Sequence, residues 1–249
     1  IMQIFEPFIW GFDDLEAIFF MTLLLLLYFA DIPYLGNEVP FYLCRMTRKI
    51  WLAGQVVYIV CATAIYTVAI LLSTILICGQ RCYVGNIWSE TAVKLAFTSA
   101  GKKLSLAASE KTLELTRPYA CMTTIFFLLF AYALCDGCLL IFWFRILWNE
   151  LAGMIAGVVF NGISFIFSPG ILQKLLGISE RKSYLANVAA GWISPLSHAT
   201  YHLHNFGYDR LPSLRDSGIY DMVLVIMLIL LNLYSIRTYH FVFDGTGER

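Results

Sequence analysis

Charged residues are scarce in this chain of 249 residues. Only 14% are Asp, Glu, Lys or Arg, whereas soluble domains average about 25%. A soluble fold needs charged surface, and long stretches of this chain contain no charge at all, so a soluble domain is disfavoured. The formal net charge is zero, which excludes the overall basic field of a nucleic-acid-binding protein. We therefore expect no nucleic-acid partner.

Motifs for catalysis and nucleotide binding are also missing. Gly101 and Lys102 resemble part of a phosphate-binding loop, but the pattern requires Gly where Ala96 stands and Ser or Thr where Lys103 stands. No HExxH zinc motif is present. The sequence thus predicts a chain that is not an enzyme and holds no catalytic residue, cofactor or metal.

Cysteines are present, but a disulfide framework is not indicated. The seven cysteines, at positions 44, 61, 78, 82, 121, 135 and 138, lie mostly inside or beside apolar runs. A free thiol behaves there as a small hydrophobic group. Cys135 and Cys138 have the spacing of a redox motif but lack the βαβ context that such a site requires. We therefore discount redox chemistry.

Apolar residues dominate instead, at 59% of the chain. Crossing about 30 Å of hydrocarbon takes about 20 apolar residues. Five candidate spans have this character: 17–30, 51–80, 118–144, 151–173 and 222–236. The first and last are short, and Glu16 and Asp221 at the interface could extend each by a turn. The sequence predicts one all-α, multi-pass transmembrane domain over 1–249.

Short and long connections alternate between these spans. The short connections, 31–50 and 145–150, fall on one side of the membrane together with the C-terminal tail. The long connections, 81–117 and 174–216, fall on the other. Lys and Arg number six on the short side and eleven on the long side, so the positive-inside rule favours long connections in the cytoplasm.

The connection after the first span has the pattern of a short amphipathic helix. Apolar residues recur at helical spacing, and basic residues share another face. The apolar stripe is Val39, Leu43, Met46 and Ile50, and the basic face is Arg45, Arg48 and Lys49. The helix could lie passively at the interface. Alternatively, its basic face could dock on a cytoplasmic partner.

Three histidines gather before the last span. His198 and His202 are four residues apart and His204 is nearby, so a zinc site is conceivable if Asp209 or water completes it. His202 and His204 cannot both face His198 on one regular helix. We favour a polar and aromatic loop without metal.

Asp136 interrupts the third candidate span. An ionised carboxylate there costs roughly 2.5–3.5 kcal/mol on insertion scales, so it should face other helices or a wet cavity. It is either a polar group of a translocation pathway or a hydrogen-bonded structural residue.

Taken in order, these features resemble the permease subunits of ABC-2 type (type V) ABC exporters of bacteria. The resemblance is carried by the stretch RMTRKIWLAGQ at 45–55 and by SPLSH at 194–198 before the last span. Family members have six spans, so the resemblance implies a further span before residue 1. It also implies two permeases, identical or homologous, paired with two ATPase subunits that bind ATP and Mg.

Several expectations follow from this resemblance. Residues 38–50 would be the coupling helix that contacts the ATPase, with Val39, Leu43, Arg45, Met46, Arg48 and Lys49 as contact residues. Residues 168–216 would be an extracytoplasmic segment before the last span. The long connections would then lie outside the cell, opposite to the orientation favoured by the basic-residue count. The cargo would be an amphipathic peptide, lipid or drug.

Two other classes of function compete with a plasma-membrane permease. A secondary transporter would use Asp136 as a proton or ion site. A membrane-embedded metalloenzyme would use His198 and His202. The sequence shows neither the hydropathy symmetry of an inverted repeat nor an acidic motif beside the histidines, so both rank lower.

Overall fold

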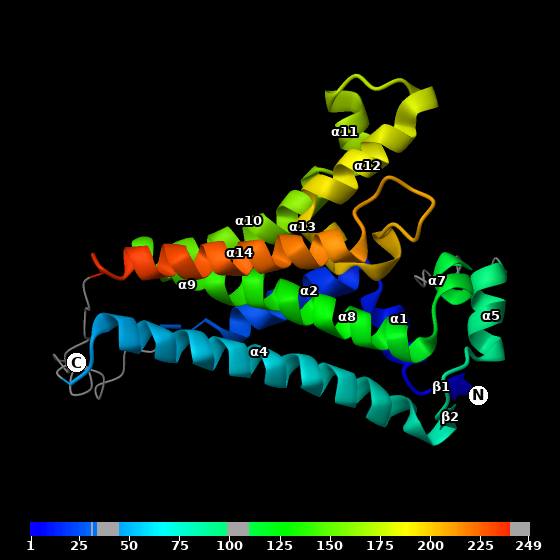
Figure 1. Cartoon of the computed structure of the whole chain (residues 1–249), viewed down its shortest axis with the longest axis horizontal. Helices are drawn as coiled ribbons and strands as arrows, with labels where there is room; N and C mark the ends of the chain where they lie inside the picture. Colours follow the sequence, from blue (N-terminus) through cyan, green and yellow to red (C-terminus); the bar gives the residue numbers. More distant parts are fainter. Residues whose placement is uncertain (31, 34–44, 99–109, 240–249) are drawn as a thin grey trace.

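The computed structural model of the chain describes residues 1–30, 32–33, 45–98 and 110–239, without the side chains of residues 80, 136–138 and 150. Most of this part is helical (Figure 1). The described helices are α1 (Glu6–Phe12), α2 (Leu15–Tyr28), α4 (Arg48–Cys78), α5 (Glu90–Phe97), α7 (Glu110–Leu115), α8 (Pro118–Ala133), α9 (Ile141–Leu147), α10 (Glu150–Ile166), α11 (Pro169–Leu175), α12 (Ser183–Ile193), α13 (Pro195–Ala199) and α14 (Leu214–Ser235). Two short strands, β1 (Met2–Gln3) and β2 (Cys82–Tyr83), pair in parallel.

A bundle of long helices forms the body of the molecule. Helices α4 and α14 run lengthwise beside a third helical run, in which α8 passes through the π-helical segment η2 (Leu134–Leu140) into α9 without a break (Figure 1). Helices α2 and α10 pack against this third run. The bundle therefore brings together segments that are far apart in the sequence.

Helices α4 and α14 are individually long and apolar enough to cross a membrane. At 1.5 Å per residue, the 31 residues of α4 extend about 46 Å, more than the hydrocarbon layer. The pair Leu151–Ile166 and Pro169–Leu175 passes the same test together but is bent by 73°. Helices α2 and α8 are apolar but shorter. Two or three spans thus follow from length and composition, and the expected five to six are not confirmed.

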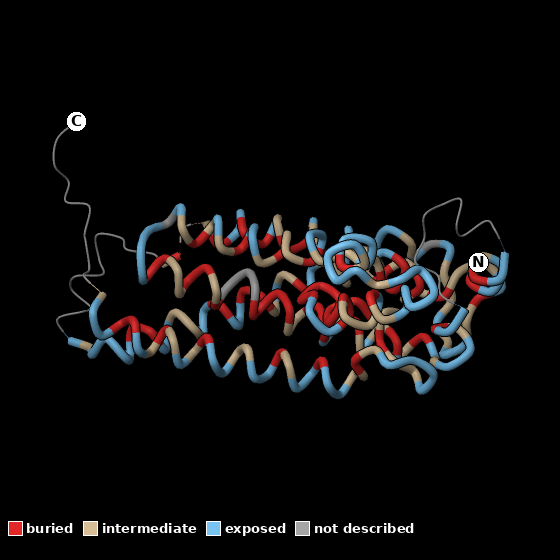
Figure 2. The backbone as a smooth tube through the Cα atoms, turned by 90° about the horizontal axis from the view of Figure 1, so that it is seen from above, coloured by how far each residue is buried: buried red, intermediate tan, exposed pale blue. Residues whose placement is uncertain are grey.

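The outer surface of the bundle is apolar, which identifies the chain as a membrane protein. In the most apolar window of α4, only 22% of the residues are buried, and α14 has the same share. Buried residues line the inside of the bundle while exposed ones face outward (Figure 2). Large apolar faces of this kind are rare on soluble monomers. They are stable when hydrocarbon surrounds them.

The two ends of the bundle differ in character. The start of α4, the turn between α9 and α10 and the end of α14 lie together at one end (Figure 1). Helices α5 and α7 lie at the other end, together with the N-terminus, and α11 and α12 project sideways from the bundle towards that end. Among the described residues, the start of α4 and the turn between α9 and α10 thus lie at one end of the bundle, and α5 and α7 lie at the opposite end. We call these the short-loop end and the long-loop end.

Local capping chemistry sets where the long helices begin. Thr47 accepts a hydrogen bond from the backbone N–H of Ile50 and caps α4, and Asn149 caps α10 through Ala152. Ser213 and Asp216 form a reciprocal capping box at the start of α14. This box starts α14 well before the apolar run 222–236.

The amphipathic helix expected over 38–50 falls partly outside the described residues, which include neither Val39 nor Leu43. In the described part, Arg45 and Met46 lie in a turn, and Arg48 and Lys49 already belong to the first turn of α4. The prediction of one continuous helix up to residue 50 is therefore wrong, because Thr47 has an extended backbone and caps the start of α4.

Candidate functional site

A cluster of polar side chains lies inside the bundle where α2, α8 and α10 meet. The hydroxyls of Thr22 and Tyr132 donate to Oδ1 of Asn161 at 2.9 and 2.8 Å. The Asn161 amide donates to the carbonyl of Gly157 at 2.9 Å. Thr22 and Asn161 are fully buried and Tyr132 nearly so. The amide thus joins three helices in a region from which water is excluded.

The π-helical segment η2 contains Asp136, the intramembrane carboxylate expected from the sequence. The structure describes the backbone there but not the side chain of Asp136. Cys135 donates its thiol to the carbonyl of Asp221 at 3.5 Å, and Asn232 donates to the carbonyl of Leu139 at 3.2 Å. π-Helical turns inside α-helices are frequent at functional sites. These two hydrogen bonds join the π-helical segment η2 to α14.

Asp221 is a second carboxylate beside η2. It is buried at 3% exposure, and among the described residues its Oδ2 has no hydrogen-bond partner. The sequence predicted that Asp221 extends the last span by a turn at the interface. Helix α14 begins earlier, at Leu214, so Asp221 lies inside the helix. A buried polar residue with one unpartnered oxygen is a candidate for proton or ion binding.

The histidines do not form the zinc site considered from their spacing. His202 faces Asp13, with its backbone N–H at 2.7 Å and its Nδ1 at 3.1 Å from Oδ1. His198 instead faces Ser217. In the described ranges, no three His, Cys, Asp or Glu side chains are grouped as metal ligands would be. The metalloenzyme alternative therefore gains no support from this geometry.

Ser217 bridges the other two histidines. Its Oγ lies 2.8 Å from Nδ1 of His198 and 2.8 Å from Nε2 of His204. The remaining ring nitrogens face the carbonyls of Trp192 at 3.3 Å and Tyr201 at 3.1 Å. Carbonyls only accept, so these nitrogens carry the protons of the neutral rings. The single hydroxyl proton of Ser217 can then satisfy only one of the two histidines.

Burial sets the ionisation of these groups, which lie outside the apolar spans. It lowers the pKa of His198 and of His204 below the ordinary imidazole value. Burial acts in the same direction on His202, but the hydrogen bonds and charge of Asp13 outweigh it and raise the pKa of His202. Burial raises the pKa of Asp13, partly offset by His202. The imidazole of His202 is therefore prone to carry a positive charge, and those of His198 and His204 are not.

Four basic residues of the short-loop end are placed by the described part of the structure. Arg45 and Lys49 are exposed and Met46 is half-buried. Arg48 instead donates to the carbonyl of Arg237 at 2.6 Å, just beyond the end of α14. Arg145 is buried and donates to the carbonyl of Phe29 at 3.2 Å. Arg48 and Arg145 thus bind carbonyls at helix ends, where the dipole favours a cation.

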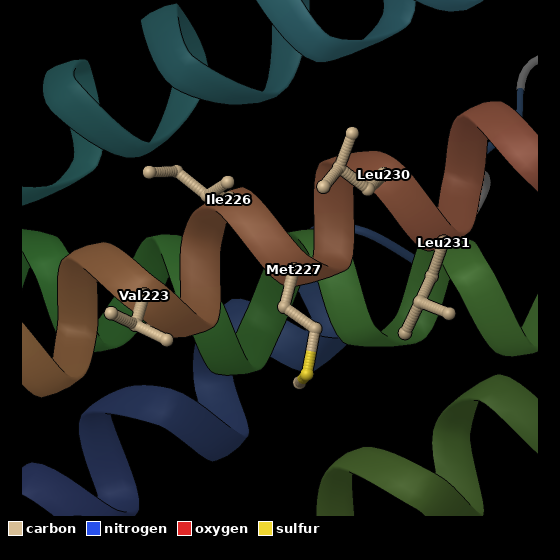
Figure 3. A pocket seen from close by; sticks show the side chains of 5 residues that line it. All are labelled: Val223, Ile226, Met227, Leu230 and Leu231. Atoms are coloured by element: carbon tan, nitrogen blue, oxygen red, sulfur yellow. The ribbon is translucent and has the colours of Figure 1, made fainter.

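The hollows on the apolar surface are less informative. One, of about 360 Å³, is formed by a single face of α14 (Figure 3). Its lining residues are Val223, Ile226, Met227, Leu230 and Leu231. A hollow made by one helix with no polar group has the features of a lipid-facing surface, so we assign it no ligand.

A comparison of the chain with protein-family models, with curated proteins and with solved structures finds no match. The function is therefore inferred from the residues of the chain and their geometry.

Proposed function

We propose that this chain is the membrane-spanning permease subunit of an ATP-driven ABC transporter of the ABC-2 type, an exporter of an amphipathic substrate in the bacterial plasma membrane. The observation that carries the proposal is the difference between the two ends of the bundle. Arg48 and Lys49 begin α4 at the short-loop end, where Arg48 binds a carbonyl just beyond α14, and the bent pair of α10 and α11 precedes α14 towards the long-loop end. The proposal rests on this difference together with the resemblance of residues 45–55 and 194–198 to that family.

Five membrane crossings follow from this proposal. They are α2, α4, the run from α8 to α9, α10 and α14. Helix α2 has only 14 residues, so it crosses with help from α1 at the long-loop end. The short-loop end faces the cytoplasm in this orientation, and α11 to α13 lie outside the cell.

The short-loop end is the surface on which an ATPase subunit would act. Arg48 and Lys49 stand in the first turn of α4, which has no acidic residue. Basic residues at a helix N-terminus oppose the macrodipole, by about 0.3–1 kcal/mol, so they do not stabilise α4. The carbonyls beyond α14 compensate Arg48. Arg45 and Lys49 are exposed and available to an acidic groove.

Closure of the ATPase subunits on ATP and Mg would push on this end of the bundle. The force would reach α4 directly and α14 through Arg48. Because α4 runs the length of the bundle and α14 runs along much of it, tilting them at one end moves the other. Two permease copies, identical or homologous, would then alternate between inward-open and outward-open states.

Copurification tests the proposal. The tagged chain is isolated from bacterial membranes in mild detergent, and an ATP-hydrolysing subunit is sought by mass spectrometry and ATPase assay. The double variant Arg45→Glu and Lys49→Glu should lose that subunit. The double variant Arg181→Glu and Lys182→Glu, at the long-loop end, should retain it. The absence of any ATPase from the wild-type complex would refute the assignment.

A proton- or ion-coupled secondary transporter is the second candidate. The observation that favours it is the carboxyl of Asp221, which is buried beside the π-helical segment that contains Asp136. In proteoliposomes without ATP, a proton gradient should then drive proton flux reported by an internal pH-sensitive dye. Asp221→Asn should abolish this flux. Transport that requires ATP would exclude this candidate.

A further inference from the structure

A cavity with both polar and apolar walls lies where α10 ends and the chain bends into α11. It has a volume of about 430 Å³. Its polar lining comes from Ser164, Ser168, Asn187, Ser194 and Ser197, and its largest apolar lining residues are Leu15, Phe165, Phe167, Leu203 and Leu211. No lining residue is charged. The cavity is therefore suited to a neutral group with an apolar extension.

The serine hydroxyls supply hydrogen-bond donors to this cavity. Ser164 Oγ accepts from the backbone N–H of Leu196 at 3.1 Å, and Ser194 Oγ accepts from that of Ser197 at 3.3 Å. A hydroxyl that accepts still has its own proton to donate. Within the described part of the chain, the Ser197 hydroxyl makes no hydrogen bond although the residue is only 6% exposed. A ligand that offers acceptor oxygens fits these groups.

The absence of charge in the lining selects among such ligands. A carboxylate or phosphate would lose its hydration without a cation to compensate it, which is costly. A carbonyl oxygen is neutral and accepts hydrogen bonds from hydroxyls. The polar part of the ligand is therefore an ester or amide carbonyl.

The depth of the cavity favours a membrane lipid as the source of that carbonyl. The cavity lies at the end of an apolar helix, where the chain bends by 73°. The ester groups of glycerolipids lie at this boundary between hydrocarbon and headgroups. Phe165 lines the cavity and is 40% exposed on the apolar surface, so an acyl chain can leave the cavity beside it and remain in hydrocarbon.

We propose that this cavity binds a glycerolipid of the surrounding membrane, with an ester carbonyl accepting from Ser197 and Ser164 and an acyl chain against Phe165. The site depends on the membrane location alone. It does not depend on an ATPase partner, so the lipid site can be tested independently of the transporter assignment.

Photo-crosslinking in lipid nanodiscs tests the site. Two zwitterionic phosphatidylcholine probes carry the same diazirine near the glycerol, one with ester-linked chains and one with ether-linked chains. Labelled peptides are mapped by mass spectrometry. The ester probe should label 164–169 and 187–203 several-fold more than the ether probe, because only the ester offers carbonyl oxygens. Equal labelling by the two probes would overturn the proposal.

Two variants distinguish the effect of the serine hydroxyls on lipid binding from the effect of the cavity volume. Ser197→Ala should bring the ester-to-ether ratio close to one, since it removes a donor that makes no bond within the described residues. Ala190→Phe should reduce labelling by both probes because it fills the cavity. Ser73→Ala is the matched control on the exposed face of α4 and should leave the ratio unchanged. A ratio that Ser197→Ala does not alter, or labelling that Ala190→Phe does not reduce, would also contradict the proposal.

Discussion

The hydroxyl of Tyr132 on α8 donates a hydrogen bond of 2.8 Å to the amide oxygen of Asn161 on α10. Both side chains are buried between apolar helices. Packing and hydrogen bonds hold helices together in a bilayer, because hydrocarbon surrounds folded and separated helices alike. This pair therefore contributes to the specific arrangement of α8 and α10.

Replacing Asn161 should measurably destabilise the bundle. Asn161→Ala removes the bonds from Tyr132 and Thr22, and each interhelical bond in a membrane contributes about 0.6–1.7 kcal/mol. We expect a loss of about 1–2 kcal/mol in reversible unfolding in mixed micelles. Ser73→Ala is the control, because this exposed hydroxyl bonds only to its own helix, at the carbonyl of Ile70. A variant Asn161→Ala as stable as Ser73→Ala would show that the amide is dispensable.

Two glycines of α10 should respond oppositely to alanine. A Cβ at Gly153 would lie 2.8 Å from the backbone oxygen of Ile141 and 2.6 Å from Arg145 Cγ, whereas none of the neighbouring atoms lies within 4 Å of a Cβ at Gly162. Gly153→Ala should force α9 and α10 apart at a cost of about 1–3 kcal/mol.

Gly162→Ala should stabilise the same helix by up to about 1 kcal/mol through helix propensity alone. Thermal unfolding of both variants in detergent measures the difference. Equal shifts for the two variants would mean that the close contact of α10 with Ile141 does not limit packing.

The ion pair of His202 and Asp13 should make stability fall on the alkaline side. A histidine whose pKa is raised by folding contributes stability that is fully present below its unfolded pKa, about 6.5, and is lost as pH rises through the folded value. The pKa values of His202 and Asp13 are both raised in the folded chain, so Asp13 likewise contributes stability that is lost as the pH rises.

The melting temperature in detergent should therefore decline from pH 6 to pH 9. In His202→Gln, which retains a side-chain donor but does not titrate, this decline should be shallower. Identical slopes in variant and wild type would remove His202 from the explanation.

His198 and His204 should make the stability of the fold decrease as the pH falls below neutral. Burial lowers the pKa of both, so the folded chain binds fewer protons than the unfolded chain. Their contribution is present above about pH 6.5 and is lost as the pH falls towards their folded values. The charge of Asp216 raises the pKa of His198 and limits this loss.

We expect His204→Gln to flatten the decline in melting temperature between pH 6.5 and pH 5 while leaving the alkaline side unchanged. His202→Gln should have the reverse effect, so each variant controls for the other. If the melting temperatures of His204→Gln and wild type decline equally between pH 6.5 and pH 5, the assignment is contradicted.

The sequence anticipated the longest helix well and the last one less well. The charge-free run 51–80 corresponds closely to α4, at Arg48–Cys78, because thirty residues without charge leave few alternatives. The run 222–236 gave the end of α14 but not its start, which the Ser213 capping box fixes at Leu214. Asp221, the residue before this run, therefore lies inside α14 and is buried. An apolar run identifies a helix, whereas a cap sets its boundary.

Partition into the membrane was determined by the sequence alone, since the cost of exposing each apolar side chain to water depends on composition and length. The tertiary structure decided which polar groups meet. Spacing suggested that His198 and His202 face one partner, yet they face Ser217 and Asp13. Asn161 meets Tyr132 from another helix. These pairings depend on the rotation and depth of each helix against its neighbours, which non-local packing fixes and a local pattern does not contain.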